Sequence, residues 1–280
     1  MELKLYPTPG DFLRDNRDFL EKHEIPAQLN RGNVAAHESE PCTSSMLFGR
    51  VELAKEPVLL FGSTQPWNLC LNAAPGDTRV HEAAQALAAY LHENSIEITG
   101  VTGRDALCQA FMKAYGGKFT LRSAMDILVL YTLIEPPPCP GTVRKAGLSD
   151  LELIVGWKCA MMREAVGEEP DPQRLQETTM DQLERSVVWL MENESGEPVS
   201  MANSGRMLEH GACVSGVYTP PEHRGHGYCQ NTVAALCREL LASGKSYVTL
   251  FVDKKNPISN RVYRKIGFDV LEDASDYRLS

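Results

Sequence analysis

The chain has 280 residues, which is enough for one large domain or two ordinary domains. Its hydrophobic content of 43% and charged content of 23% are typical of a soluble globular protein. The formal net charge of −9 argues against non-specific binding to nucleic acid, because an acidic surface repels a polyanion.

The sequence shows no sign of export or of membrane insertion. The first residues, 1–7, lack the apolar core of a signal peptide, and no apolar run approaches the ~20 residues of a membrane span. The chain has 8 cysteines, none in a Cys-x-x-Cys pair, and its histidines do not show metal-ligand spacing. We therefore expect a cytoplasmic protein with reduced, mostly buried thiols, no metal site and no membrane partner.

The first half alternates helical and strand patterns. Helical spacing of apolar residues predicts helices at 11–24, 81–93 and 105–115, and the polar segment 29–45 is expected to form a helix and a loop. β-Branched and alternating stretches predict strands at 47–53, 58–62, 67–72, 96–101 and 125–133. A proline-rich stretch at 136–141 follows and is the best candidate for a linker.

The second half has a similar order of predicted elements. Strands are expected at 143–146, 186–192, 198–207, 212–219 and 246–253. Helices are expected at 148–166, 171–182 and 231–241, and a further helix is expected to begin at Pro257 and to be ended by Gly267. The sequence thus predicts two domains, 1–135 and 142–280, of fold class α/β with an α+β mixed sheet.

The most informative stretch is Thr219-Pro220-Pro221-Glu222-His223-Arg224-Gly225-His226-Gly227, between a strand and a helix. Glycines let the backbone turn its N–H groups outward, and a helix N-terminus adds unpaired N–H donors with partial positive charge. This arrangement predicts a site for phosphate or pyrophosphate. It is not a Walker A loop, and alone it fits a glycine-rich turn without a ligand equally well.

A second motif lies downstream, after the strand at 246–253. In it, Asn256 is a candidate helix cap with Pro257 at the first helical position, and Gly267 is a candidate helix end. Tyr263 lies between them on the same predicted helix.

Together these motifs resemble the GNAT acyl-CoA N-acyltransferase superfamily. Residues 224–229 match its Arg-x-x-Gly-x-Gly/Ala signature and residues 256–268 its Asn…Tyr-x-x-x-Gly-Phe/Tyr signature, except that Cys229 stands where the family has Gly or Ala. The resemblance covers about 186–280 and is strongest to a bacterial subgroup of predicted acetyltransferases of this length. It implies a tandem GNAT-like fold, with a catalytic domain at 142–280 and a degenerate GNAT-like domain at 1–135.

The resemblance also implies site residues. Acetyl-CoA would be the co-substrate, with its pantetheine arm along Val217, Tyr218 and Thr219. Its pyrophosphate would accept from the N–H groups of Gly225, His226, Gly227, Tyr228 and Cys229. Arg224 would add a charge-assisted contact, and Asn256 and Asn260 would bond the cofactor or orient Tyr263. Tyr263 would protonate the CoA thiolate as general acid.

The acceptor and the general base are left open by the sequence. An amino acid, a polyamine, an antibiotic or a protein terminus would each supply a primary amine, and the acceptor pocket is expected within 150–185 and part of the first half. Glu209, His210 and Glu222 are base candidates by position only. The oligomeric state is open between monomer and homodimer, because the C-terminal strand can pair with a partner or with the other half.

Two alternatives to an acetyltransferase remain at this point. A non-catalytic acyl-CoA-binding or regulatory protein can have the same fold, since fold does not fix function. An unrelated phosphate-binding α/β domain would require the second motif to match by chance.

Overall fold

A computed structural model describes residues 1–35, 37–167 and 170–280, and the side chains of residues 33, 35, 165 and 166 are also left out of the description. Residues 36 and 168–169, which fall in the predicted segments 29–45 and 150–185, therefore lie outside the described residues. The chain forms two compact units. The first unit comprises Met1–Ile127, Val252–Lys255 and Val270–Ser280, and the second comprises Leu128–Phe251 and Asn256–Asp269.

The first unit is built on one mixed sheet. Its strands, in spatial order, are β1 (Glu2–Leu5), β2 (Met46–Leu53), β3 (Glu56–Thr64), β4 (Leu69–Asn72), β5 (Gly100–Gly103) and β12 (Asp269–Leu279). Neighbours in this order are antiparallel except β4 and β5, which are parallel. Strand β6 (Phe119–Leu130) runs from this unit into the second.

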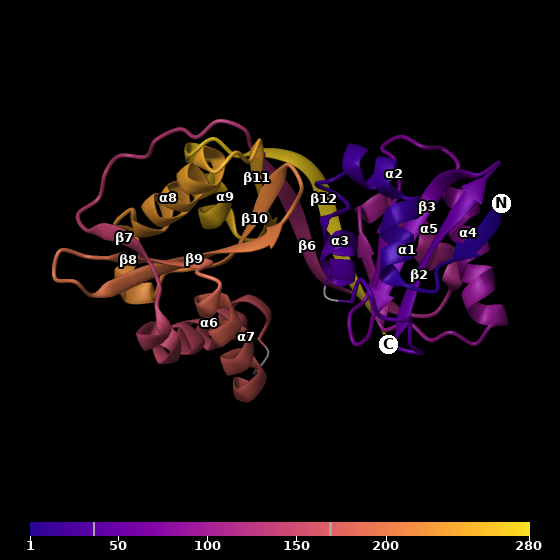
Figure 1. The fold of residues 1–280 in the computed structure, drawn as a ribbon, viewed down its shortest axis with the longest axis horizontal. Coiled ribbons are helices and arrows are strands. Elements are labelled where there is room, and N and C mark those ends of the chain that lie inside the picture. The colour runs from indigo at the N-terminus through magenta and orange to yellow at the C-terminus, as the bar shows by residue number, and fades with distance from the viewer. Residues whose placement is uncertain (36, 168–169) are drawn as a thin grey trace. The chain divides into compact units, whose positions relative to one another are not determined.

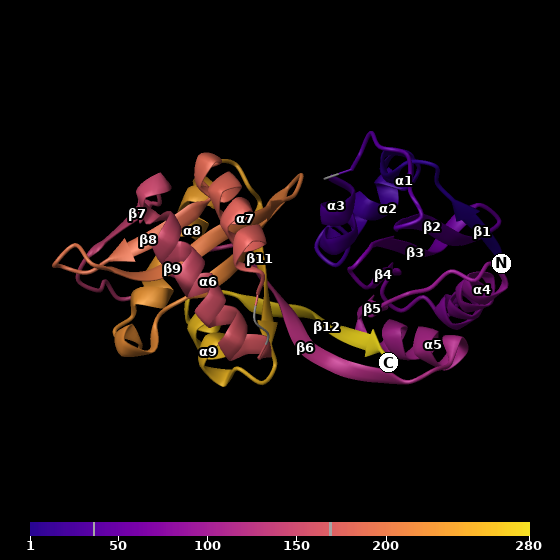
Figure 2. The same ribbon diagram turned by 90° about the horizontal axis from the view of Figure 1, so that it is seen from below.

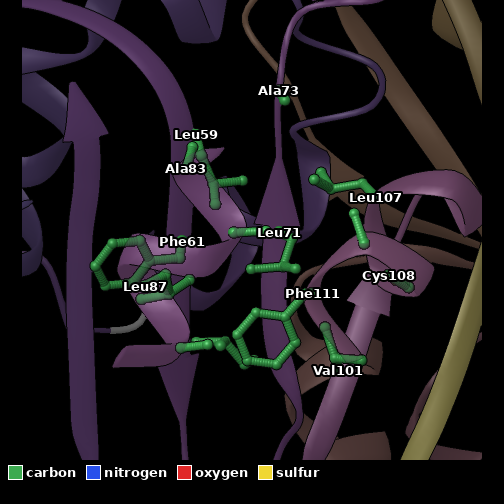
Figure 3. Packing of buried hydrophobic residues seen from close by; sticks show 14 of the residues in the cluster. Leu59, Phe61, Leu71, Ala73, Ala83, Leu87, Val101, Leu107, Cys108 and Phe111 are labelled. Carbon is green, nitrogen blue, oxygen red and sulfur yellow. The ribbon is translucent and has the colours of Figure 1, made fainter. Parts of the chain in front are cut away.

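Two groups of helices cover the two faces of this sheet. On one face, α1 (Pro9–Asp15), α2 (Arg17–Lys22) and α3 (Gln28–Ala35) pack on Phe48 and Leu60. On the other, α4 (Val80–Glu93) and α5 (Asp105–Tyr115) pack on Leu59 and Phe61. Figure 3 shows Leu87 and Phe111 of these helices meeting Phe61 and Leu71 of the strands. Successive residues of β3 thus face opposite cores, as the period of a strand requires.

The second unit repeats this architecture. Its strands, in spatial order, are β11 (Tyr247–Asp253), β10 (Gly211–Tyr218), β9 (Pro198–Met207), β8 (Val188–Glu192) and β7 (Thr142–Lys145). Only the β10–β11 pair is parallel among these neighbours. Helices α6 (Leu151–Val166) and α7 (Pro172–Glu184) cover one face, and α8 (Tyr228–Ala242) covers the other (Figures 1 and 2). Helix α9 (Pro257–Lys265) follows β11.

The order of elements confirms the prediction of two similar halves. In each half, helices separate the first two strands, a helix joins the parallel pair, and another helix and a strand follow. The last strand of the chain, β12, completes the sheet of the first unit by pairing with β5. The end of β6 belongs to the second unit, where the Leu128 carbonyl accepts from Thr249 Oγ1 of β11 at 2.7 Å.

Several predicted bounds are wrong for local reasons. The helix expected at 11–24 is two helices, because Asn16 ends the first and donates its side-chain amide to the Phe12 carbonyl. The strand expected at 96–101 starts only at Gly100, since the Ile96 N–H returns to the Leu91 carbonyl at the end of α4. Strand β6 begins at 119 rather than 125, and β1 was not predicted at all.

The proline-rich stretch predicted as a linker is attached to the second unit. Glu135 makes an ion pair with Arg238 of α8, with Oε2 and Nη2 2.5 Å apart. Asn231 of the same helix donates to the Pro137 carbonyl at 3.1 Å. The division between the compact units falls at Ile127, before this stretch. Within the described part of the chain, no helix is long and apolar enough to cross a membrane.

Candidate acyl-CoA site

The site is built where β10 separates from β11. Their parallel pairing runs from Gly211 and Tyr247 to Val214 and Leu250, and β10 then continues to Tyr218 without a partner on β11 among the described residues. The pairing of β10 with β9 is also irregular between Ser215 and Tyr218. The end of β10 therefore offers backbone groups that its parallel neighbour does not use.

Gly216 is the residue that makes this irregularity possible. Its φ of +57° lies in the left-handed region that glycine adopts most easily. A Cβ at this position would lie 2.8 Å from Nδ2 of Asn203 on β9, so a side chain would also collide with that amide. Conformation and space together require glycine at the bulge.

The loop after β10 ends in a group of unengaged N–H donors. Gly225 and Gly227 have φ values of +86° and +83°, and α8 begins directly after them. The N–H groups of residues 225–230 donate to no acceptor among the described residues, whereas that of Asn231 already bonds the Gly227 carbonyl. These donors, at the positive end of a 15-residue helix, form a cradle for an anion. We call residues 225–230 the N–H cradle.

Arg224 takes part in a contact network that the sequence did not predict. Its Nη2 lies 2.6 Å from Oε2 of Glu164, at the end of α6, and its Nε donates to the Thr219 carbonyl at 2.9 Å. Tyr218 donates its hydroxyl to the other Glu164 oxygen at 2.8 Å. Burial and this hydrogen bond raise the pKa of Tyr218 to about 12. Arg224 therefore holds the loop against α6 rather than presenting a free guanidinium.

Cys229 occupies the position at which the sequence departs from the family motif. Burial raises the pKa of its thiol to about 11, and the thiol bonds the Thr219 side chain. Thr219 in turn shares a 2.8 Å hydrogen bond with Ser200 of β9. The side chain of Cys229 is thus engaged with the protein, and its thiol stays protonated at neutral pH.

Helix α9 carries the two asparagines and the tyrosine of the second motif. Asn256 caps it, with Oδ1 accepting from the Ser259 N–H at 3.0 Å, and Pro257 is its first residue. The Asn260 amide donates to the Asn256 carbonyl at 2.9 Å. The predicted cap is confirmed, and it uses the Asn256 oxygen that was also a candidate for the cofactor.

Tyr263 is the buried residue of α9, faces α8 and is only 6% exposed. Burial raises its pKa well above the ordinary value, and the nearby Cys229 and Cys237 of α8 raise it further. Its ring meets that of Phe268 edge-on, with centroids 6.0 Å apart. The fold therefore brings Tyr263 next to the first turn of α8, and no partner of its hydroxyl is found in 1–35, 37–167 or 170–280.

Two of the three candidate bases, Glu209 and His210, are not brought to this site. Glu209 and His210 form the turn before β10, so the eight residues of that strand, roughly 25 Å, separate them from the loop. That turn is held by the Ser246 N–H, which donates to the His210 carbonyl at 2.7 Å. Glu222 is an exposed residue of the loop itself. Among the described residues, no group of His, Cys, Asp or Glu has the arrangement of a metal site.

A buried polar group on the α6–α7 side was missed at the sequence level. Lys158 of α6 is 6% exposed and donates to Thr179 Oγ1 at 2.9 Å and Gln182 Oε1 at 2.5 Å. Burial lowers its pKa to about 8. The available signal was its place on the apolar stripe of α6, since Ile154 and Met161 lie four residues before and three after it.

The corresponding loop of the first unit contains a carboxylate of the protein itself, that of Asp77. Between β4 and α4, Asp77 accepts from the Arg79 N–H at 2.9 Å and makes an ion pair with its guanidinium at 2.6 Å. The Asp77 side chain is 9% exposed. A carboxylate thus lies before α4 of the first unit, at the position that corresponds to the N–H cradle at the start of α8 in the second unit.

Comparisons with known proteins agree with this geometry. Residues 152–268 match the model of the Acetyltransferase (GNAT) family, while no curated protein matches the chain in sequence. A GNAT-family acetyltransferase from Colwellia psychrerythraea is similar over all of both chains, at 13% identity and a TM-score of 0.63. A GCN5-related N-acetyltransferase from Sphaerobacter thermophilus is similar at 14% identity and a TM-score of 0.64, over 99% of this chain and 95% of that one.

A tandem GNAT protein from the clavulanic acid biosynthesis pathway also shares the fold. It is 14% identical, with a TM-score of 0.58, over 100% of this chain and 98% of that chain. At this identity the likeness shows the tandem fold alone, and the activity class, acyl-CoA-dependent acetyl transfer, comes from the family match. The match to the Acetyltransferase (GNAT) family covers residues 152–268, which is less than half of the chain.

Proposed function

We propose that the second domain, 142–280, transfers an acetyl group from acetyl-CoA to a primary amine of a small molecule or peptide. The observation that carries this proposal is the end of the β10–β11 pairing at Val214, directly before the N–H cradle of residues 225–230. The pantetheine arm would lie along residues 217–219 like an added strand, and its pyrophosphate would be held by the cradle. A backbone N–H of the same strand would polarise the acetyl carbonyl.

The reaction needs a neutral amine and a proton for the leaving group. The amine nitrogen attacks the thioester carbon, the carbon–sulfur bond breaks, and the thiolate takes up a proton while the amine gives one to a base or to water. Tyr263 is the proposed acid. Because burial favours its neutral form, the phenol keeps its proton at neutral pH, and the same burial makes a thiolate beside it more basic.

The first domain, 1–135, has a structural role in this proposal. Asp77 places a carboxylate at the start of α4 and accepts from the Arg79 N–H, so a phosphate group would meet a like charge there. Cofactor binding is therefore assigned to the second domain only.

The test is a comparison of Tyr263→Phe with wild type and with Tyr247→Phe. Tyr247 is also 6% exposed but lies at the start of β11, at the end opposite the cradle. We expect Tyr263→Phe to lower kcat on an accepted amine by about 100-fold, the usual scale of general acid catalysis, without weakening acetyl-CoA binding. Tyr247→Phe should keep its kcat.

Other results would change the proposal. An unchanged kcat in Tyr263→Phe would remove this residue from the chemistry. Acetyl-CoA binding with no turnover on any amine would instead support the non-catalytic acyl-CoA-binding alternative.

A further inference from the structure

A buried lysine on the α6–α7 face of the second unit has no negatively charged partner among residues 1–35, 37–167 and 170–280. Lys158 is 6% exposed, and both acceptors of its ammonium group, Thr179 Oγ1 and Gln182 Oε1, are neutral. Within the described residues no carboxylate pairs with it, and an ammonium group has three protons to donate. Lysine is rarely buried without a pair, because an uncompensated charge is costly away from water.

A buried acceptor next to this lysine is also unused. Asn203 of β9 is 3% exposed and donates to Gln182 Oε1 at 3.3 Å. Its own Oδ1 is buried and has no hydrogen-bond partner in the described part of the chain. The bonds from Lys158 and Asn203 end on the same Gln182 oxygen, so the two side chains belong to one hydrogen-bonded group. The Lys158 ammonium and Asn203 Oδ1 require, respectively, an anion and an N–H donor.

The position of these groups relates them to the acyl site. Asn203 pairs in register with Ser215, and its amide lies against Gly216, at the bulge where β10 has left β11. Lys158, Thr179 and Gln182 reach the same place from α6 and α7, on the face of the sheet opposite α8. This polar group therefore approaches the free end of β10 from the face opposite the helix that carries the N–H cradle.

We propose that Lys158, Gln182 and Asn203 form the acceptor subsite, and that the acceptor is an amine that also carries a carboxylate, such as an amino acid. The carboxylate would accept from the Lys158 ammonium, and the amine would donate an N–H to Asn203 Oδ1. Polyamines would be rejected, because Lys158 repels a second cation. This inference rests on the proposed function, since it names the substrate class of the same site.

The probes are the proteinogenic amino acids and their carboxamides, which have the same amine but lack the negative charge. We expect at least one amino acid to raise the melting temperature of the full chain in the presence of CoA. With acetyl-CoA, its kcat/KM should exceed that of its amide by at least tenfold. Lys158→Met, or Lys158→Gln if the first variant does not fold, should make acid and amide equal.

Lys245→Met is the matched control. Lys245 is half-buried, whereas Lys158 is buried, and it bonds a backbone carbonyl, that of Leu208, close to the start of β10 and away from the loop. This variant should keep the preference for the acid over the amide.

The outcomes separate this inference from the proposed function. If acetyl-CoA binds but acids and amides are used equally, or if no amino acid is bound or acetylated, the acceptor subsite is wrong and the cofactor site stands. If acetyl-CoA does not bind, the proposed function fails. The subsite would then be judged by whether amino acids raise the melting temperature of wild type but not of Lys158→Met.

Discussion

Burial shifts the pKa values of two different residues of this domain, Tyr263 and Lys158. Burial favours the uncharged form of both side chains, so the pKa of the tyrosine is raised and that of the lysine is lowered to about 8. For Tyr263 this preserves a proton donor. For Lys158 it brings the pKa close to neutral pH, so that an anionic ligand would stabilise the charged form of the lysine.

The lowered pKa of Lys158 predicts a specific dependence of stability on pH. The folded state loses this proton near pH 8, while the unfolded state keeps it up to about 10.5, the ordinary value. Between these limits the unfolded state binds more protons, so this residue makes the free energy of unfolding rise with pH. Lys158→Met should lack that contribution, and Lys245→Met should retain it.

The measurement is denaturant unfolding followed by tryptophan fluorescence between pH 8 and 10.5. With Trp67→Phe as background, the signal comes from Trp157 and Trp189, which both lie in the second unit. Parallel pH curves for wild type and Lys158→Met would show that the lysine is not desolvated as the structure indicates.

The sequence identified the individual residues of the loop better than their partners. Gly225, Gly227 and the Asn256 cap follow from local backbone rules, which a sequence expresses directly. The ion pair of Arg224 was not predicted, because its partner, Glu164, lies 60 residues earlier in the chain and nothing local indicates that contact.

At the scale of elements, the site depends on one strand and the start of one helix. Strand β10 ends free of β11, and α8 begins directly after Gly227, whose backbone is left-handed. The strand–loop–helix order was predicted from sequence, because alternation, glycine spacing and helical periodicity are all local signals. The bulge at Gly216 was not, because it depends on the neighbouring Asn203 amide.

The start of α8 allows a controlled test of the cradle. Gly227→Ala would strain a residue with φ of +83°, and it should weaken acetyl-CoA binding at least tenfold by displacing the N–H donors. Gly244→Ala introduces the same strain at the other end of α8, where φ is +95° and no atom lies within 4 Å of an added Cβ. Calorimetric titration should show normal affinity for that control. Equal losses in both variants would indicate a general effect on the helix.

At the scale of the whole molecule, the chain's last strand belongs to its first unit. Tyr277 of β12 is 8% exposed, packs in the core of that unit and donates its hydroxyl to Asp105 at 2.7 Å. The order of elements let the sequence predict two similar halves. It left open whether the last strand pairs with a partner or with the other half, because its alternating pattern suits either sheet edge.

Because β12 belongs to the first unit, a substitution near the C-terminus should destabilise the N-terminal half. Tyr277→Ala should lower the stability of the first unit by about 3–5 kcal/mol, the usual scale for removing a buried aromatic ring. Leu271→Ala, at a position 45% exposed, should cost less than about 0.5 kcal/mol. Trp67 fluorescence reports on this unit, and an unchanged Trp67 transition in Tyr277→Ala would contradict the assignment of β12.

The central claim is that the N–H cradle binds acyl-CoA, and thermal melting of the full chain with acetyl-CoA tests it most directly. At ~100 times its dissociation constant, a ligand specific for the folded state adds ~2.7 kcal/mol, which corresponds to a shift of a few degrees for a chain of this length. We predict such a shift with acetyl-CoA, and longer acyl-CoAs in parallel will reveal the preferred chain length. The absence of a shift with every acyl-CoA would contradict the account.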